Sequence, residues 1–200
     1  MLLRAGDPEA ASLLPRLDRH GDFAPGWLLV GDALLACGHA HAGLAAATRG
    51  MRALSRAGTS RSQMSRALHL LGRALRAANR DAEARAAFEQ AVEADPFHAE
   101  GWYSLALLRQ DAHENAAAAA AYRQALRARP DFHEAALNLG VALGECGRME
   151  EALDAYAQAL RLRPDSFGRI AQSLVSGQTG LLFLDPARLR ATLEDRSRSS

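Results

Sequence analysis

The chain has 200 residues, enough for one compact domain or one short repeat array, and it is rich in alanine and poor in aromatic residues (6%), which favours closely packed helices. Its net charge is +1, all 24 basic residues are arginine, and its two distant cysteines indicate neither a disulfide framework nor a structural zinc site. No segment approaches the length of a membrane span and the N-terminus lacks the apolar run of a signal peptide, so we expect a cytoplasmic protein without a membrane segment.

The first predicted element is a single helix within residues 1–22. Asp7 stands where a helix N-cap is expected and Pro8 at the first helical position, while Pro15 would break or kink the helix. The segment looks like the second half of the repeated unit described below, so we interpret it as an N-terminal half-repeat helix.

The sequence pattern of residues 24–57 predicts a helical hairpin. In "GWLLVGDALLACG" the large apolar residues recur at helical intervals, and Gly38 stands where the first helix would end. The second helix, at roughly 41–54, carries only small residues on the face that meets the first, so we expect a looser hairpin than those that follow. We interpret the next segment, "GTSRSQM" at 58–64, as an insertion that forms a longer helix end and a loop.

The following part of the chain repeats itself at an interval of 34 residues, in the copies 65–98, 99–132 and 133–166. The segments that show this most plainly are "AFEQAVEADP" at 87–96, "AYRQALRARP" at 121–130 and "AYAQALRLRP" at 155–164. Block positions 4, 7, 8 and 11 form one stripe of a first helix, and positions 20, 24 and 27 form a stripe of a second. Proline at position 32 ends the second helix.

Individual block positions have a clear physical role. Small residues at positions 8 and 20 let the two helices approach, and a large ring at position 24 fills the space beside them. Position 15, which holds Asn79, His113 and Gly147, is where we expect the first helix to end, because Gly and Asn tolerate the left-handed conformation. Arg109 at position 11 departs from the pattern, and we expect its stem to pack while its guanidinium reaches water.

This pattern resembles the tetratricopeptide repeat of bacterial proteins. The resemblance implies an all-α fold: a right-handed α-solenoid of helix–turn–helix tetratricopeptide repeats with an N-terminal half-repeat and C-terminal capping helices. It also implies a non-catalytic scaffold or adaptor that binds a protein or peptide partner in a concave groove lined by the first helices. No cofactor is implied.

After Pro164 the repeat pattern fails. We expect residues 167–195 to cap the apolar end of the stack, first with a helix that carries Phe167, Ile170, Leu174 and Val175, then with a short helix that begins at Asp185–Pro186 and carries Leu189 and Leu193. The apolar strip "LLFL" at 181–184 fits either a cap or a docking site. Residues 196–200 are expected to form a disordered tail.

The distribution of charge along the chain indicates which part of the groove binds the partner. Residues 1–80 carry a net charge of +6 and residues 81–165 a net charge of −7, and no acid occurs between Asp32 and Asp81. The resemblance places a run of cations on the groove wall of copy 65–98, which predicts a surface for an acidic segment, unless these arginines pair with acids elsewhere in the fold. The predicted partner-binding residues are Arg66, His69, Arg73, Arg76, Tyr103, Gln110 and Asn138.

Two alternatives remain open from the sequence. Cys37, His39 and His41 could ligate a metal and support a metal-dependent activity, although three ligands in a predicted turn are thin evidence for a zinc site. The arginine-rich face at 49–80 could bind nucleic acid, although the acidic segment that follows and the scarcity of groove aromatics argue against it. No catalytic grouping of Ser, His and acid stands out.

Overall fold

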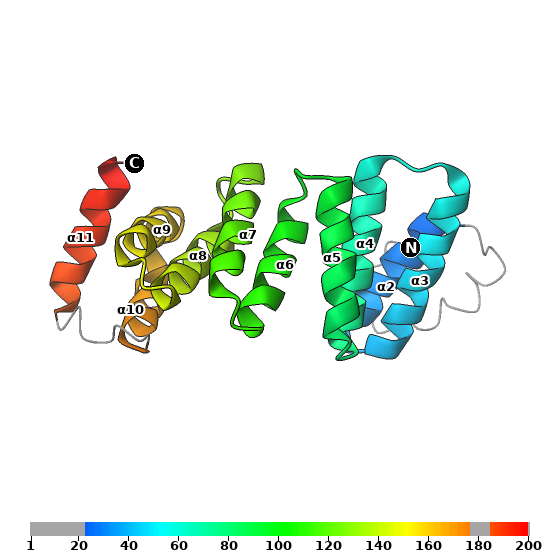
Figure 1. The fold of residues 1–200 in the computed structure, drawn as a ribbon, viewed down its shortest axis with the longest axis horizontal. Coiled ribbons are helices and arrows are strands. Elements are labelled where there is room, and N and C mark those ends of the chain that lie inside the picture. The colour runs from blue at the N-terminus through cyan, green and yellow to red at the C-terminus, as the bar shows by residue number, and fades with distance from the viewer. Residues whose placement is uncertain (1–22, 177–184, 200) are drawn as a thin grey trace. The chain divides into compact units, whose positions relative to one another are not determined.

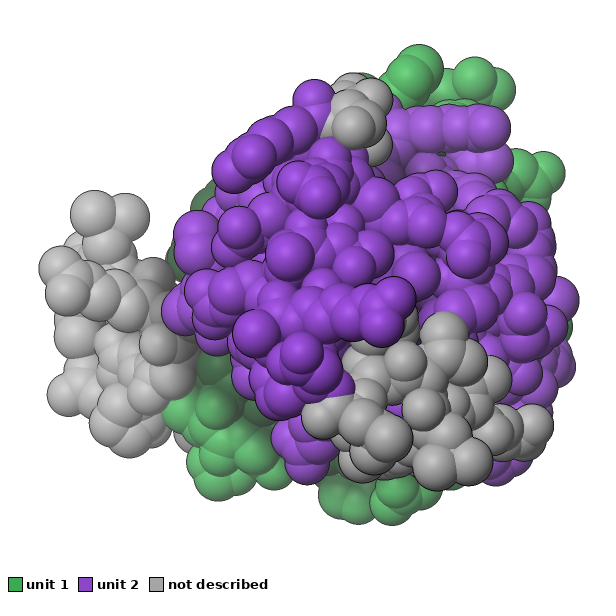
Figure 2. Space-filling view, turned by 90° about the vertical axis from the view of Figure 1, so that its left-hand side faces the viewer, with its two compact units in different colours: residues 1–104 green, residues 105–200 purple. Residues whose placement is uncertain are grey.

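The computed structural model describes residues 23–176 and 185–199, and these residues are all helical or in the turns that join helices (Figure 1). The chain divides into two compact units, unit 1 (residues 1–104) and unit 2 (residues 105–200), which are coloured separately in Figure 2. The predicted half-repeat helix at 1–22 and the apolar strip at 181–184 lie outside the described residues. In chain order the helices are α2 (Ala24–Ala36), α3 (Ala40–Ala57), α4 (Arg61–Ala77), α5 (Asp81–Ala94), α6 (Ala99–Asp111), α7 (Asn115–Ala128), α8 (His133–Glu145), α9 (Met149–Leu162), the 3-10 helix η2 (Pro164–Ser166), α10 (Phe167–Ser176) and α11 (Pro186–Ser199).

Four helices, α2, α4, α6 and α8, end in the same way, and each is the first helix of a hairpin. The residue at block position 15 takes a left-handed φ, of 80° at Gly38, 58° at Asn79, 59° at His113 and 71° at Gly147. The amide of the next residue then donates back to the last turn, as from Arg80 to the carbonyl of Leu75 at 2.9 Å. This is the Schellman ending, which satisfies carbonyls that the helix leaves without a partner. The predicted ends of the first helices are confirmed.

A glycine at block position 8 allows the ring at position 24 to lie directly against the first helix. A Cβ atom on Gly72 would come within 2.5 Å of the ring of Phe88, and one on Gly140 within 2.5 Å of the ring of Tyr156. Both rings are buried. The predicted pairing of a small residue with a large ring is therefore confirmed in these two hairpins.

The α2–α3 hairpin is tighter than we expected from the sequence. A Cβ atom on Gly31 would lie 3.3 Å from the backbone nitrogen of Ala47 and 3.4 Å from the carbonyl oxygen of Gly43, so the two helix backbones nearly touch. The side chain of Leu35 lies 2.8 Å from where a Cβ of Gly43 would stand. The expectation of a looser hairpin is wrong, because leucines of the first helix fill the space that a ring of the second helix fills elsewhere.

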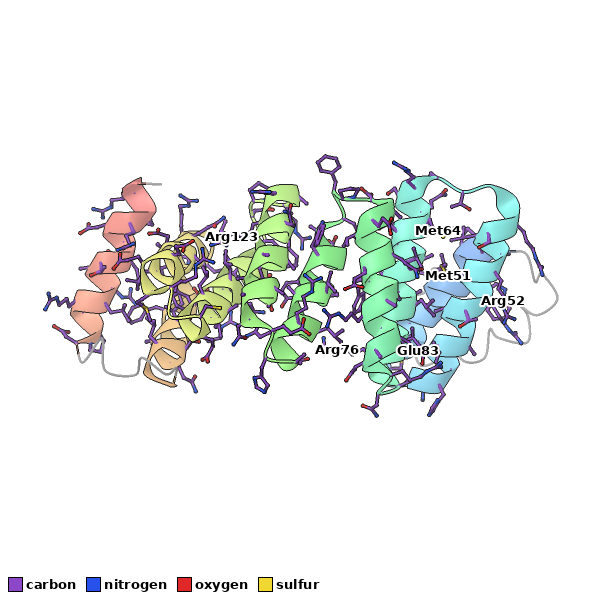
Figure 3. The ribbon with its side chains drawn as sticks, in the orientation of Figure 1. Met51, Arg52, Met64, Arg76, Glu83 and Arg123 are labelled. Atoms are coloured by element: carbon purple, nitrogen blue, oxygen red, sulfur yellow. The ribbon has the colours of Figure 1, made fainter. Side chains whose placement is uncertain are left out.

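Residues 58–60 connect α3 to α4, and the rest of the predicted insertion, residues 61–64, forms the first turn of α4. Gly58 ends α3 with a φ of 68°, and Ser60 caps α4 by accepting a hydrogen bond from the amide of Gln63 at 3.2 Å, while the side chain of Gln63 accepts one from the amide of Ser60 at 3.2 Å. This reciprocal capping box explains why α4 begins before the repeated segment does. Met51 of α3 and Met64 of the added turn pack between the two helices (Figure 3).

In unit 2, α10 packs on α8 and α11 packs on α9. Ile170, Leu174, Leu189 and Leu193 are all buried, as a capping role for these two helices requires. Since α8 and α9 are the first and second helices of a hairpin, α10 covers its first helix and α11 covers its second.

The expectation of a disordered tail is wrong for residues 196–199, because α11 continues to Ser199. Arg196 explains the extension, since its guanidinium pairs with the carboxylates of Glu150 and, at 2.6 Å, Asp154 on α9. No described helix is both long and apolar enough to cross a membrane. The all-α, helical-repeat class that the sequence predicted is confirmed.

Candidate functional site

The predicted partner-binding residues divide between the two units. Unit 1 contains Arg66, His69, Arg73, Arg76 and Tyr103, and unit 2 contains Gln110 and Asn138. Arg66 and Arg73 are exposed, and the others are partly buried. Figure 3 labels Arg76 near the C-terminal end of α4.

The predicted run of cations, which comprises Arg66, Arg73 and Arg76 on α4 and Arg80 after it, is partly neutralised within the protein. Arg73 donates to Asp32 of α2 at 2.6 Å, and both side chains are less than half exposed. Arg80, just beyond the helix, pairs with Glu83 at 2.6 Å. The alternative that these arginines pair with acids of the fold is therefore realised for two of them. Because exposed ion pairs contribute little stability, a partner could displace either acid at small cost.

A pocket of about 390 Å³ lies in unit 1, between α4 and the start of α6. Two of the predicted residues, Arg66 and His69, meet in it. The other lining residues come from the first turn of α4, from the α5–α6 turn and from the start of α6. The full lining is Ser62, Arg66, His69, Asp95, Phe97, His98 and Glu100.

His98 is held at the pocket by a hydrogen-bond chain through Ser65. The hydroxyl of Ser65, which is fully buried, lies 2.7 Å from the carbonyl oxygen of Ala91 and 2.6 Å from Nδ1 of His98. A carbonyl only accepts and a hydroxyl has one proton, so Ser65 donates to Ala91 and accepts from the Nδ1–H of His98. The neutral ring therefore carries its proton on Nδ1 and a lone pair on Nε2.

His69 stays neutral beside His98. Its Nε2 and the Oγ of Ser104 are 2.8 Å apart, and its ring meets that of His98 edge-on, with centroids 4.9 Å apart at 82°. Burial, and then the charges of His98 and Arg73, lower the pKa of His69 to about 3. His69 thus forms part of the pocket floor as a neutral hydrogen-bonding ring.

The exposed side of His98 faces an acid. Nε2 of His98 lies 3.8 Å from a carboxylate oxygen of Glu100, and burial lowers the pKa of His98 below its usual value of 6.5. Glu100 and Asp95 oppose this effect, and Arg66 adds to it. Near neutral pH the pocket therefore presents two carboxylates, one guanidinium and a ring nitrogen that accepts hydrogen bonds.

Phe97 projects from the rim of this pocket with 83% of its surface exposed. Its backbone is fixed, because its amide donates to the side chain of Asp95 at 3.1 Å. Sequence reasoning missed both Phe97 and His98, since they follow the repeat's proline and do not belong to the helix face on which the groove was sought. A large aromatic residue in a turn that the helical pattern does not require was the available signal.

In unit 2 the predicted site residue Gln110 already has a partner, since its Oε1 accepts from the hydroxyl of Tyr122 at 2.7 Å. Its neighbour Arg109 turns its guanidinium back toward the carbonyl of Ala117, at 3.5 Å, so the expected reach into water is only partial. Neither side chain is as available to a partner as the sequence suggested.

A second pocket, of about 350 Å³, lies on unit 2 among α7, α8 and α9. Its charged rim is largely paired within the protein, since Glu151 binds both Arg123, at 2.6 Å, and Arg148, at 2.7 Å (Figure 3 labels Arg123). Its apolar floor is made of core leucines, Leu139 and Leu143. This pocket therefore offers fewer available polar groups than that of unit 1.

The residues considered for a metal lie at the α2–α3 turn. Cys37 follows α2, His39 precedes α3, and His41 is in its first turn. Across 23–176 and 185–199, no three His, Cys, Asp or Glu side chains come together in an arrangement that could hold a metal ion. The structure thus gives the metal alternative no geometric support.

Two segments match family models described as tetratricopeptide repeat, residues 65–98 and residues 103–167. No curated protein sequence matches the chain. Solved structures do match. A crystal structure of MamA is 18% identical, with a TM-score of 0.67, over 83% of this chain and 98% of that one. A second MamA structure is 20% identical, with a TM-score of 0.64, over 78% and 82%. YrrB, described as a TPR protein with an unusual peptide-binding site, is 17% identical, with a TM-score of 0.66, over 94% of each chain. These identities support the fold alone.

Proposed function

Because this chain is a tetratricopeptide repeat protein, we propose that it acts as a non-catalytic scaffold or adaptor, which binds a peptide or protein partner in a groove lined by its first helices. A shared fold does not by itself establish a function, so the proposal depends on the site. YrrB, of similar fold, is described as having a peptide-binding site, which is consistent with a peptide as the partner. Neither Cys37 nor Cys146 forms a disulfide bond, which is consistent with the cytoplasmic location that we propose.

The observation that carries the proposal is Phe97. An aromatic side chain that is 83% exposed contributes little to the core of the free protein and remains accessible to a partner. Its backbone is held in place by Asp95, and it stands beside the exposed guanidinium of Arg66. Aromatic and arginine side chains are enriched in protein interfaces, and those that become buried near the centre of an interface often dominate the binding free energy.

We further propose that the partner carries an acidic segment that runs along α4. Arg66 and Arg73 are both exposed on this helix. An acidic partner would have to compete with Asp32 for Arg73, since the two now form an ion pair at 2.6 Å. Arg66 requires no such exchange, because no described carboxylate forms an ion pair with it.

Affinity capture from native lysate tests the proposed function. The bait is the full chain as wild type or as the double variant Arg66→Ala/Phe97→Ala. The control is Arg52→Ala/Leu29→Ala, which removes an arginine and an exposed apolar residue elsewhere in unit 1; Arg52 is labelled on α3 in Figure 3. We expect a specific partner to be recovered with wild type and control and lost with the site variant, while all three give the same helical circular dichroism. Equal recovery by all three baits would refute the assignment.

A further inference from the structure

We infer that the pocket of unit 1 receives a basic side chain, lysine or arginine, of the bound peptide, with Glu100, Asp95 and Nε2 of His98 as acceptors and the ring of Phe97 against the cation. This inference rests on the proposed function and adds the chemistry of the residue that the pocket selects. It differs from the charge pattern of the sequence, which predicted only an acidic segment.

The first step is the direction of the hydrogen bond that His98 can make. The hydroxyl of Ser65 donates its only proton to the carbonyl of Ala91, so Nδ1 of His98 must be the protonated nitrogen that donates to Ser65. Nε2 then offers a lone pair to the pocket. A ligand that meets Nε2 must therefore bring a donor.

The second step is the spacing of the acceptors. Nε2 of His98 and the nearer carboxylate oxygen of Glu100 are 3.8 Å apart, and neither supplies a proton to the other while the histidine is neutral. An ammonium or guanidinium placed beside them can donate to both at once. A carboxylate has about four acceptor positions, so other contacts of Glu100 leave room for this one.

The third step is the charge of the lining. With both histidines neutral, the pocket contains two carboxylates against the single guanidinium of Arg66. A cation entering the pocket gains more from Asp95 and Glu100 than it loses to Arg66 at the rim. Phe97 adds an accessible π face, which favours a cation by a further electrostatic attraction.

The position of Arg66 makes the inference distinguishable from a model in which the pocket itself receives an acidic side chain of the peptide. If the pocket takes a cation, Arg66 is a like charge nearby, and removing it should strengthen binding of a basic residue. If the pocket takes an anion, removing Arg66 should weaken binding and removing Glu100 should strengthen it. The two single variants therefore give opposite results under the two models.

The probe is the tripeptide acetyl-Ala-Arg-Ala-amide, titrated into the full chain at pH 7.5 and followed by the side-chain nitrogen and carbon signals of His98 in NMR spectra. The same peptide with citrulline in place of arginine is the matched control, since it retains the shape and loses the charge. A peptide with glutamate in that place tests the opposite charge. The protein variants are Glu100→Gln, Arg66→Ala and, as an exposed acid of α5 outside the pocket, Glu93→Gln.

We expect the arginine peptide to shift the His98 signals to saturation, and the citrulline and glutamate peptides to bind about tenfold more weakly or less. Glu100→Gln should weaken the arginine peptide by about tenfold, Arg66→Ala should strengthen it, and Glu93→Gln should leave it unchanged. Equal affinity for the arginine and citrulline peptides, or for wild type and Glu100→Gln, would overturn the inference. Even with that result, loss of the partner from Arg66→Ala/Phe97→Ala in the affinity capture would still support the proposed function.

Discussion

The Nδ1 atom of His98 lies 2.6 Å from the hydroxyl oxygen of Ser65, and this contact joins the last residue of one repeat to its first. The hydroxyl also lies 2.7 Å from the carbonyl of Ala91 on α5, so one serine orders a ring and selects its tautomer. The ring in turn meets His69 edge-on. The polar floor of the pocket thus depends on a buried hydroxyl that does not itself line the pocket.

Ser65→Ala should therefore change the pocket as well as the stability. The variant leaves the Nδ1–H of His98 without its acceptor, which we expect to lower the free energy of unfolding by about 1–3 kcal/mol. It should also shift the proton of His98 from Nδ1 toward Nε2, visible in long-range nitrogen–proton NMR spectra of the ring. Ser55→Ala is the control, because Ser55 is exposed and bonds only within α3. An unchanged tautomer in Ser65→Ala would contradict this account of the site.

Stability should fall with acid, and His69 should account for much of the change. Burial lowers the pKa of His69 to about 3, whereas the unfolded chain takes up this proton near 6.5. The contribution of the neutral ring is complete above that upper value and is lost as the pH falls toward the lower one. Between pH 7 and pH 5 the loss amounts to about 2 kcal/mol.

Urea unfolding of wild type and His69→Gln at the two pH values measures this contribution. Glutamine can still hydrogen-bond Ser104 but does not titrate. The pKa values of His98 and His133 are also lowered by burial, so both proteins should lose stability in acid, and the variant should lose less by about 2 kcal/mol. Parallel loss in the two proteins would show that His69 is not held neutral.

Two glycines of α8 should respond to alanine in opposite directions. A Cβ on Gly140 would meet the ring of Tyr156 at 2.5 Å, and one on Gly144 would meet no neighbouring atom within 4 Å. We expect Gly140→Ala to cost about 1–3 kcal/mol of unfolding free energy by overpacking. Gly144→Ala should be neutral or stabilising by up to about 1 kcal/mol, because alanine favours the helix. Chemical denaturation of both variants checks the pair, and a stable Gly140→Ala protein would show that the ring has room to move.

The C-terminal helix should be held by apolar contact more than by charge. Leu193 is fully buried, whereas the partners of Arg196, Glu150 and Asp154, are mostly exposed. Arg196→Ala should therefore cost about 1 kcal/mol or less, and Leu193→Ala about 2–4 kcal/mol. Hydrogen exchange of the amides of α11 should accelerate strongly only in Leu193→Ala. The reverse order would mean that the ion pairs hold the helix.

Local features of the repeat could be predicted from the sequence. Asn79 and Gly147 end their helices because a left-handed residue is needed there, and that need depends on the adjacent backbone alone. Gly72 and Gly140 face rings because the interval between block positions 8 and 24 places the glycine and the ring at the same level of the two paired helices. Predictions of this kind need no knowledge of distant parts of the chain.

The site residues depended on distant contacts, which periodicity does not reveal. Arg73 pairs with Asp32 of another hairpin, and Gln110 accepts a hydrogen bond from Tyr122, so these polar residues of the predicted groove face already have partners within the protein. Phe97 and His98 follow a proline, outside either helix stripe, and only the fold of the α5–α6 turn brings them to Arg66. The run of cations in the sequence indicated the region of the pocket, but it did not reveal the hydrogen-bond acceptors that line it.

Site-specific photo-crosslinking tests most directly whether the rim of the unit 1 pocket contacts a partner. A benzophenone amino acid is placed at Phe97, and in a matched protein at Leu29, which is the apolar residue of unit 1 that is 48% exposed on α2. After irradiation in native lysate, mass spectrometry identifies the attached proteins. We predict a discrete adduct from position 97 that is absent from position 29 and is reduced by an excess of unlabelled wild-type chain. The same set of adducts from both positions, or none from position 97, would contradict the proposed binding surface.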